Sequence, residues 1–173
     1  MRVGRRVDDN RWTSVPHLVN TPAAPLTRVS QTALRDGVLI ALAESLTSGL
    51  LASRVGAAPD ASSWFAGGVV AYRTAVKEDL LGLPPGTDPC SAECAEQLAR
   101  GVRTLLAADV SISTTGVGGP DPQDGHPPGT VYLGWATSTG SGHRLLRIDG
   151  PPETVVETTV AEALALLDGV LSR

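Results

Sequence analysis

The stretch Val38-Leu-Ile-Ala-Leu-Ala-Glu-Ser-Leu-Thr-Ser-Gly-Leu50 decides how the rest of the chain can be arranged. Six apolar residues run without a break from Val38 to Ala43 and lead directly into Glu44 and Ser45. An apolar run of this length followed by a Thr-Ser-Gly cluster predicts a buried strand that passes through a turn into a helix over 46–55. Ser45 then lies at the carboxyl end of the strand, beside the free N–H groups of the helix start.

Two interpretations of this turn are open on the stretch alone. Ser45 or Thr47 could merely cap the following helix, since their hydroxyl groups accept hydrogen bonds from backbone N–H groups. Alternatively, Ser45 is a nucleophile whose oxyanion donors come from the same short piece of chain.

The composition limits the classes of protein to consider. The 173 residues suit one domain, and a hydrophobic content of 42% with a charged content of 18% is typical of a globular chain. Fourteen basic and eighteen acidic residues leave a net charge of −4, with no basic block that predicts nucleic-acid binding. The apolar runs are too short to cross a membrane and no signal peptide is recognisable, so we expect a cytoplasmic protein.

The cysteine and lysine content is also informative. Cys90 and Cys94 have no second Cys or His pair to complete a metal site, so we expect no metal and read Cys94 as a small core residue. Thirteen of the fourteen basic residues are arginine, and the only lysine is Lys77. Because a partly buried lysine can lose its proton and an arginine cannot, Lys77 is a candidate for a position that needs a neutral amine.

The pattern along the chain predicts one α/β domain. We expect a weakly ordered N-terminal tail over residues 1–28 and the folded domain over 29–173, with a short helix over 27–35 at the boundary. Strands are expected over 38–43, 64–72, 109–115, 130–136 and 144–148, and further helices over 46–55, after Thr74, after Ser91 and over 153–171, the last with Val156 facing inward. Strands that alternate with helices and end in a hairpin predict a three-layer α/β/α sandwich with a mixed sheet.

Three reactive side chains follow the predicted strands. Ser45 ends the first strand, Tyr72 ends the second, and Lys77 lies five residues later at a helix start. In open α/β sheets, such strand ends form the ligand crevice, so the three groups could converge there. None of the histidines is well placed as a base, which leaves a Ser–Lys pair if burial lowers the pKa of Lys77. Each residue also has a structural interpretation, Tyr72 as an edge aromatic and Lys77 as a solvated charge.

A glycine-rich loop gives a second signal. Thr115-Gly-Val-Gly-Gly-Pro120 follows a predicted strand but lacks the residues of a phosphate-binding P-loop and the spacing of a dinucleotide fingerprint. Its exposed N–H groups suit an anionic or amide ligand, although a flexible surface loop is equally compatible with this composition.

Several motifs, taken together, resemble one known family. Ala43-Glu-Ser-Leu-Thr-Ser-Gly49 is similar to the Ala-Glu-Ser-Cys-Thr-Gly-Gly motif of the CinA C-terminal domains, also called the PncC or nicotinamide-nucleotide amidase family. The segments 63–72, 77–82, 114–120 and 128–131 also match, in order, and the resemblance spans about residues 29–171.

This resemblance implies a compact α/β/α amidohydrolase that converts nicotinamide mononucleotide into nicotinic acid mononucleotide and ammonia without a metal or other cofactor. It assigns Ser45 as the nucleophile, Lys77 as the general base and Tyr72 as an assisting hydroxyl. It also implies a homo-oligomer that takes a small-molecule substrate, whereas the composition is the reason to expect a cytoplasmic protein with no nucleic-acid or membrane partner. The resemblance puts the substrate against the following residues: Leu46, Thr47, Ser48, Gly49, Thr115, Gly116, Gly118 and Gly119.

The chain departs from the family pattern in two regions. Leu46 and Ser48 replace a cysteine and a glycine, and Gly150-Pro151-Pro152 stands where the family has Gly-Asp-Arg. A further family arginine aligns with Val156. Since arginine is the side chain best suited to phosphate, two alternatives stay open: an amidase for a phosphate-free amide, and a non-catalytic ligand-binding or assembly domain.

Overall fold

A computed structural model of the chain describes residues 23–172. A single five-stranded sheet has the order β2-β1-β3-β4-β5, in which β1, β2 and β3 are parallel and β4 and β5 are antiparallel to their neighbours. The strands are β1 (Ile40–Glu44), β2 (Phe65–Val70), β3 (Val110–Gly116), β4 (Thr130–Ala136) and β5 (Ser141–Arg147). The helices are α1 (Ala23–Asp36), α2 (Leu50–Gly56), the short 3-10 helix η1 (Ala61–Ser63), α3 (Thr74–Leu81), α4 (Ala92–Leu105) and α5 (Pro152–Leu171).

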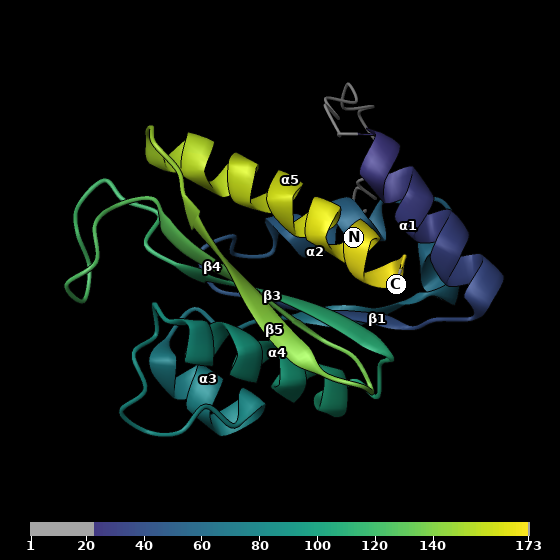
Figure 1. Cartoon of the computed structure of the whole chain (residues 1–173), viewed down its shortest axis with the longest axis horizontal. Helices are drawn as coiled ribbons and strands as arrows, with labels where there is room; N and C mark the ends of the chain where they lie inside the picture. The colour runs from purple at the N-terminus through teal and green to yellow at the C-terminus, as the bar shows by residue number, and fades with distance from the viewer. Residues whose placement is uncertain (1–22, 173) are drawn as a thin grey trace, which may run out of the picture.

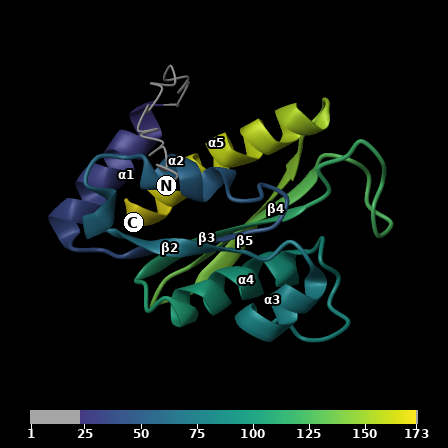
Figure 2. The ribbon, with the colours of Figure 1, turned by 180° about the vertical axis from the view of Figure 1, so that it is seen from behind.

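The helices cover both faces of the sheet. Helices α1, α2 and α5 lie on one face and α3 and α4 on the other, as Figure 1 and the view from behind in Figure 2 both show. Each face has its own apolar core, one around Ile40, Leu42 and Leu164 and the other around Ala41, Ala43 and Leu98. Because β1 contributes to both cores, its residues are fully buried, which confirms the expected α/β/α sandwich with a mixed sheet.

Helix α1 is longer than the sequence pattern predicts. It begins at Ala23 instead of at residue 27, and Leu26 is buried in the core. Residues 23–28 therefore belong to the folded domain, and the rest of the expected tail, residues 1–22, lies outside the described residues.

Two further helices differ in position or phase. Helix α2 begins at Leu50 and not at 46, because Ser48 and Gly49 have the left-handed φ angles of 50° and 99°. In the first turn of α5, Val155 is fully buried, while Val156, which was expected to face inward, is only partly buried. The helix after Ser91 starts as expected, since the Ser91 hydroxyl accepts a hydrogen bond from the N–H of Cys94 at 3.1 Å.

No helix within residues 23–172 combines the length and the apolar character needed to cross a membrane.

Candidate functional site

A buried carboxylate builds the turn that follows β1. Glu44 is 1% exposed, and its side chain accepts a hydrogen bond from the Thr47 hydroxyl at 2.7 Å. It also accepts three from backbone N–H groups at the start of α2, those of Gly49 and Leu51 at 3.0 Å and that of Ala52 at 2.7 Å. A carboxylate that accepts this many hydrogen bonds is held in one position, and its negative charge stabilises the N-terminus of α2, which is the positive end of the helix dipole.

This network fixes the position of Ser45. The Ser45 N–H donates to the carbonyl of Thr114 on β3 at 2.9 Å, and the Thr47 and Thr114 hydroxyl groups lie 2.8 Å apart. Ser45 is 6% exposed, and within residues 23–172 its hydroxyl group forms no hydrogen bond. The turn therefore holds the Ser45 backbone firmly and leaves its hydroxyl free to react.

Ser45 lines a cavity of about 190 Å³ at the carboxyl edge of the parallel strands. The wall comes from the ends of β1, β2 and β3 and from the start of α5, and its residues are Ser45, Leu46, Tyr72, Gly116, Gly118, Gly119, Gln123, Pro152 and Val156. None of these lining side chains carries a charge. Other surface hollows, between α3 and α4 and beside the β4–β5 turn, contain none of the predicted site residues.

Tyr72 reaches the same cavity from the neighbouring strand. It lies just beyond β2, where the N–H of Ala71 donates to the carbonyl of Glu44 at 2.8 Å and ties the two strand ends together. Its side chain is 67% exposed. The structure thus brings Ser45 and Tyr72 to one cavity, as their places after adjacent parallel strands predict.

Lys77 is buried but lies outside the cavity lining. It is 3% exposed in the first turns of α3, and no carboxylate among residues 23–172 forms an ion pair with it. Burial lowers the pKa of its amine, while the nearby Cys94, Cys90 and Asp124 oppose that shift. Lys77 therefore has the environment of a neutral amine, but within residues 23–172 it forms no hydrogen bond with Ser45.

The predicted substrate-binding residues divide into two groups. Leu46, Gly116, Gly118 and Gly119 line the cavity, while Thr47, Ser48, Gly49 and Thr115 do not. The Thr115 hydroxyl donates to the carbonyl of Pro89 at 2.6 Å, and the Ser48 N–H donates to the carbonyl of Ser45 at 3.1 Å. These contacts stabilise the turn and the loop, and the Ser48 N–H is therefore not free to bind a substrate.

Four backbone N–H groups at the site have no partner in the part of the chain that the structure describes. In residues 23–172, the N–H groups of Leu46 and Thr47 and those of Gly118 and Gly119 form no hydrogen bond within the chain.

The loop that follows β3 requires glycine at position 116. A Cβ atom there would lie 2.3 Å from the carbonyl oxygen of Thr130, and the φ angle of Gly116 is 144°, which side chains rarely allow.

The two cysteines are buried scaffold residues. Burial raises the pKa of the Cys90 thiol to about 11, and burial also raises that of Cys94. The Cys90 thiol lies 3.7 Å from the carbonyl of Thr130. Within residues 23–172 no group of three or more His, Cys, Asp or Glu side chains is arranged to hold a metal ion.

Sequence reasoning missed four contributors to the site. Gln123, Pro152 and Val156 line the cavity, and Glu44 organises the turn. The signal for Glu44 was present, since a lone acidic residue at the end of a buried apolar run must be paired with donors. The signal for Val156 was its alignment with a family arginine.

Comparison with known proteins gives consistent findings. Residues 24–171 match the family model described as the CinA C-terminal domain. A competence-damage inducible protein of Geobacillus kaustophilus is 48% identical over 116 residues, which cover 64% of this chain and 28% of that protein. The chain thus spans about a third or less of the length of the curated relatives it matches.

Solved structures of similar size also match. A CinA superfamily protein from Klebsiella pneumoniae has a TM-score of 0.82 at 31% identity, covering 86% of this chain and 96% of that one. A CinA superfamily protein from Escherichia coli has a TM-score of 0.82 at 30% identity, covering 95% and 99%.

Proposed function

This chain belongs to the family of CinA C-terminal domains, and from that premise we propose that it is an amidohydrolase that converts a nicotinamide-type carboxamide into a carboxylate and ammonia. One observation carries the proposal: the Glu44 network holds Ser45 at a cavity wall with its hydroxyl free. The resemblance of the motifs suggests nicotinamide mononucleotide as the first substrate to test.

In the proposed reaction, the Ser45 hydroxyl oxygen attacks the amide carbon and its proton passes to a base. The free N–H group of Leu46, which lines the cavity, donates to the oxyanion that forms. The tetrahedral intermediate collapses to an acyl-serine, and the amide nitrogen takes up the proton and leaves as ammonia. Water then attacks the acyl group, which restores Ser45 and releases the carboxylate.

We assign the base to Lys77. Its lowered pKa favours the neutral amine that can accept a proton. Because Lys77 lies outside the cavity lining, we propose that a water molecule carries the proton from the Ser45 hydroxyl to the Lys77 amine. Tyr72 assists from the cavity wall, and no metal or cofactor enters this scheme.

A second candidate function is a binding or assembly domain without catalysis. The position of Lys77 outside the cavity lining and the replacement of the family arginines by Pro152 and Val156 favour it. We also propose that the chain works in the cytoplasm, on the basis of its sequence composition, and that it is a homo-oligomer, on the basis of the family resemblance. Light scattering of the purified chain tests the oligomeric state.

The experiment that separates the two functions is ammonia release from purified protein supplied with nicotinamide mononucleotide and with unphosphorylated nicotinamide compounds. The enzyme proposal predicts release from at least one of them. No release from any compound, together with a ligand-induced rise in melting temperature, would favour the binding domain instead.

A further inference from the structure

The start of α5 forms part of the cavity wall, and this part is unsuited to an anion. Pro152 and Val156 line the cavity there. An adjoining hollow shares both residues and adds Glu153 and Glu157. The uncharged cavity therefore continues into a groove whose charged side chains are acidic.

The first turn of α5 has lost the donors that usually make a helix start attractive to phosphate. The N-cap residue is Pro151 and the first helical residue is Pro152, and neither has an N–H group. Glu153 follows, so a carboxylate already occupies the positive end of the helix. Both features weaken the attraction of this wall for a negatively charged ligand.

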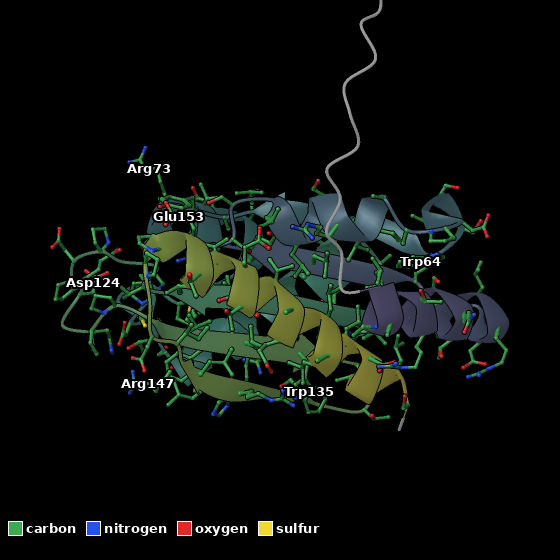
Figure 3. The ribbon with its side chains drawn as sticks, turned by 90° about the horizontal axis from the view of Figure 1, so that it is seen from above. Trp64, Arg73, Asp124, Trp135, Arg147 and Glu153 are labelled. Atoms are coloured by element: carbon green, nitrogen blue, oxygen red, sulfur yellow. The ribbon has the colours of Figure 1, made fainter. Side chains whose placement is uncertain are left out.

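Glu153 is the dominant charge of the groove. Glu157 lies 3.2 Å from the guanidinium of Arg54, which partly neutralises it. Within the described residues 23–172, Glu153 forms no ion pair. Figure 3 shows Glu153 at the start of α5, at the same end of the molecule as the loop residue Asp124.

The arginines at this end do not compensate. Arg73 points away from the body of the molecule in Figure 3 and is absent from the cavity lining. Arg147, at the end of β5, donates a hydrogen bond to the Thr130 hydroxyl and is also absent from the lining. The glycines that line the cavity, Gly116, Gly118 and Gly119, offer only backbone N–H donors, and such donors bind a neutral carbonyl group as well as an anion.

We propose that this site selects amides whose far end is neutral or cationic, and that Glu153 discriminates against substrates that carry a phosphate there. The proposal rests on the proposed amidohydrolase function and specifies the part of the substrate beyond the amide. The preferred ligand is then a pyridinium carboxamide without a phosphate, that is, a nucleoside and not a nucleotide.

Nicotinamide riboside and nicotinamide mononucleotide form a matched pair for the test, because they share the pyridinium carboxamide and differ only in the phosphate. We expect kcat/KM for ammonia release to be about five- to tenfold higher for the riboside. Glu153→Gln should bring the two values together, and Glu153→Lys should reverse the preference. The control Glu162→Gln removes the same charge farther along α5 and should leave the ratio unchanged.

The outcomes test the selection against phosphate separately from the proposed amidohydrolase activity. Hydrolysis of both compounds with equal or higher kcat/KM for the mononucleotide would overturn the charge selection and leave the amidohydrolase intact. If neither compound is hydrolysed, calorimetric binding to the Ser45→Ala variant decides the selection independently. Tighter binding of the riboside then supports it, and tighter binding of the mononucleotide, or no binding of either, overturns it.

Discussion

The ends of β1 and β2 lie side by side in the sheet, yet they are built in opposite ways. At the end of β1, Glu44 is 1% exposed and receives four hydrogen bonds, and Ser45 beside it is 6% exposed. At the end of β2, Tyr72 is 67% exposed, and Arg73 caps α3 without a side-chain hydrogen bond. The chain therefore fixes one strand end through a buried polar network and leaves the other open to solvent.

This difference indicates how the two ends contribute. A serine whose backbone is held in a buried hydrogen-bonded turn presents its hydroxyl group from one fixed position, which a nucleophile needs. A hydroxyl group on an exposed side chain can help a reaction but is not positioned by its surroundings. We therefore expect substitutions at the end of β1 to have large effects and those at the end of β2 to have small ones.

The largest loss of stability is expected for Glu44→Ala. It leaves the Thr47 hydroxyl and the N–H groups of Gly49, Leu51 and Ala52 without their acceptor, so the free energy of unfolding should fall by about 3–5 kcal/mol. Glu44→Gln, which keeps one acceptor oxygen, should cost about 1–3 kcal/mol. Urea unfolding measures both.

The matched control is Glu162→Ala, which removes an exposed carboxylate that meets Arg144 at 3.4 Å. We expect a change within about 0.5 kcal/mol. An equal loss in the Glu44 and Glu162 variants would show that the buried network does not hold the end of β1.

The next effect is expected at Lys77. Replacing the proposed base in Lys77→Met should lower kcat/KM for ammonia release by about 10²–10⁴-fold. Lys77→Arg keeps the positive charge but cannot supply a neutral amine, so it should be equally inactive. Turnover that survives in folded Lys77→Arg would exclude Lys77 as the base.

Lys77 also gives stability a defined pH dependence. Since burial lowers its pKa in the folded state, the unfolded chain binds more protons between that lowered pKa and the ordinary value of 10.5. Stability from this group therefore rises with pH across that window. Urea unfolding at several pH values should show the rise in the wild type relative to Lys77→Met, and parallel curves would contradict a lowered pKa.

The smallest effect is expected for Tyr72→Phe. Because the side chain is 67% exposed, the free energy of unfolding should change by less than about 0.5 kcal/mol. We expect kcat/KM to fall by less than about tenfold. A loss as large as that expected for Ser45→Ala would show that the two strand ends contribute equally, contrary to the comparison.

The local features of the fold could be predicted because they depend on neighbouring residues. The apolar run that forms β1, the Ser91 cap of α4 and the β4–β5 hairpin all follow from residues close in sequence. The late start of α2 could not, since it depends on left-handed backbone at Ser48 and Gly49.

The candidate site was predictable only in part, because some of its residues are positioned by contacts between elements that are distant in the sequence. Ser45 and Tyr72 end adjacent parallel strands, so topology brings them together. The position of Lys77 outside the cavity lining depends on how α3 packs against α4, and the acidic groove depends on the phase of α5. Both result from tertiary packing, which sequence periodicity does not specify.

The most direct test of the central claim compares Ser45→Ala with Ser53→Ala, a substitution of an exposed serine on α2. Ammonia release from nicotinamide riboside and from nicotinamide mononucleotide is measured for both variants and for the wild type. The account predicts release by the wild type and Ser53→Ala, a loss of at least about 10³-fold in Ser45→Ala, and unchanged stability in all three. Release that persists in folded Ser45→Ala would contradict Ser45 as the nucleophile.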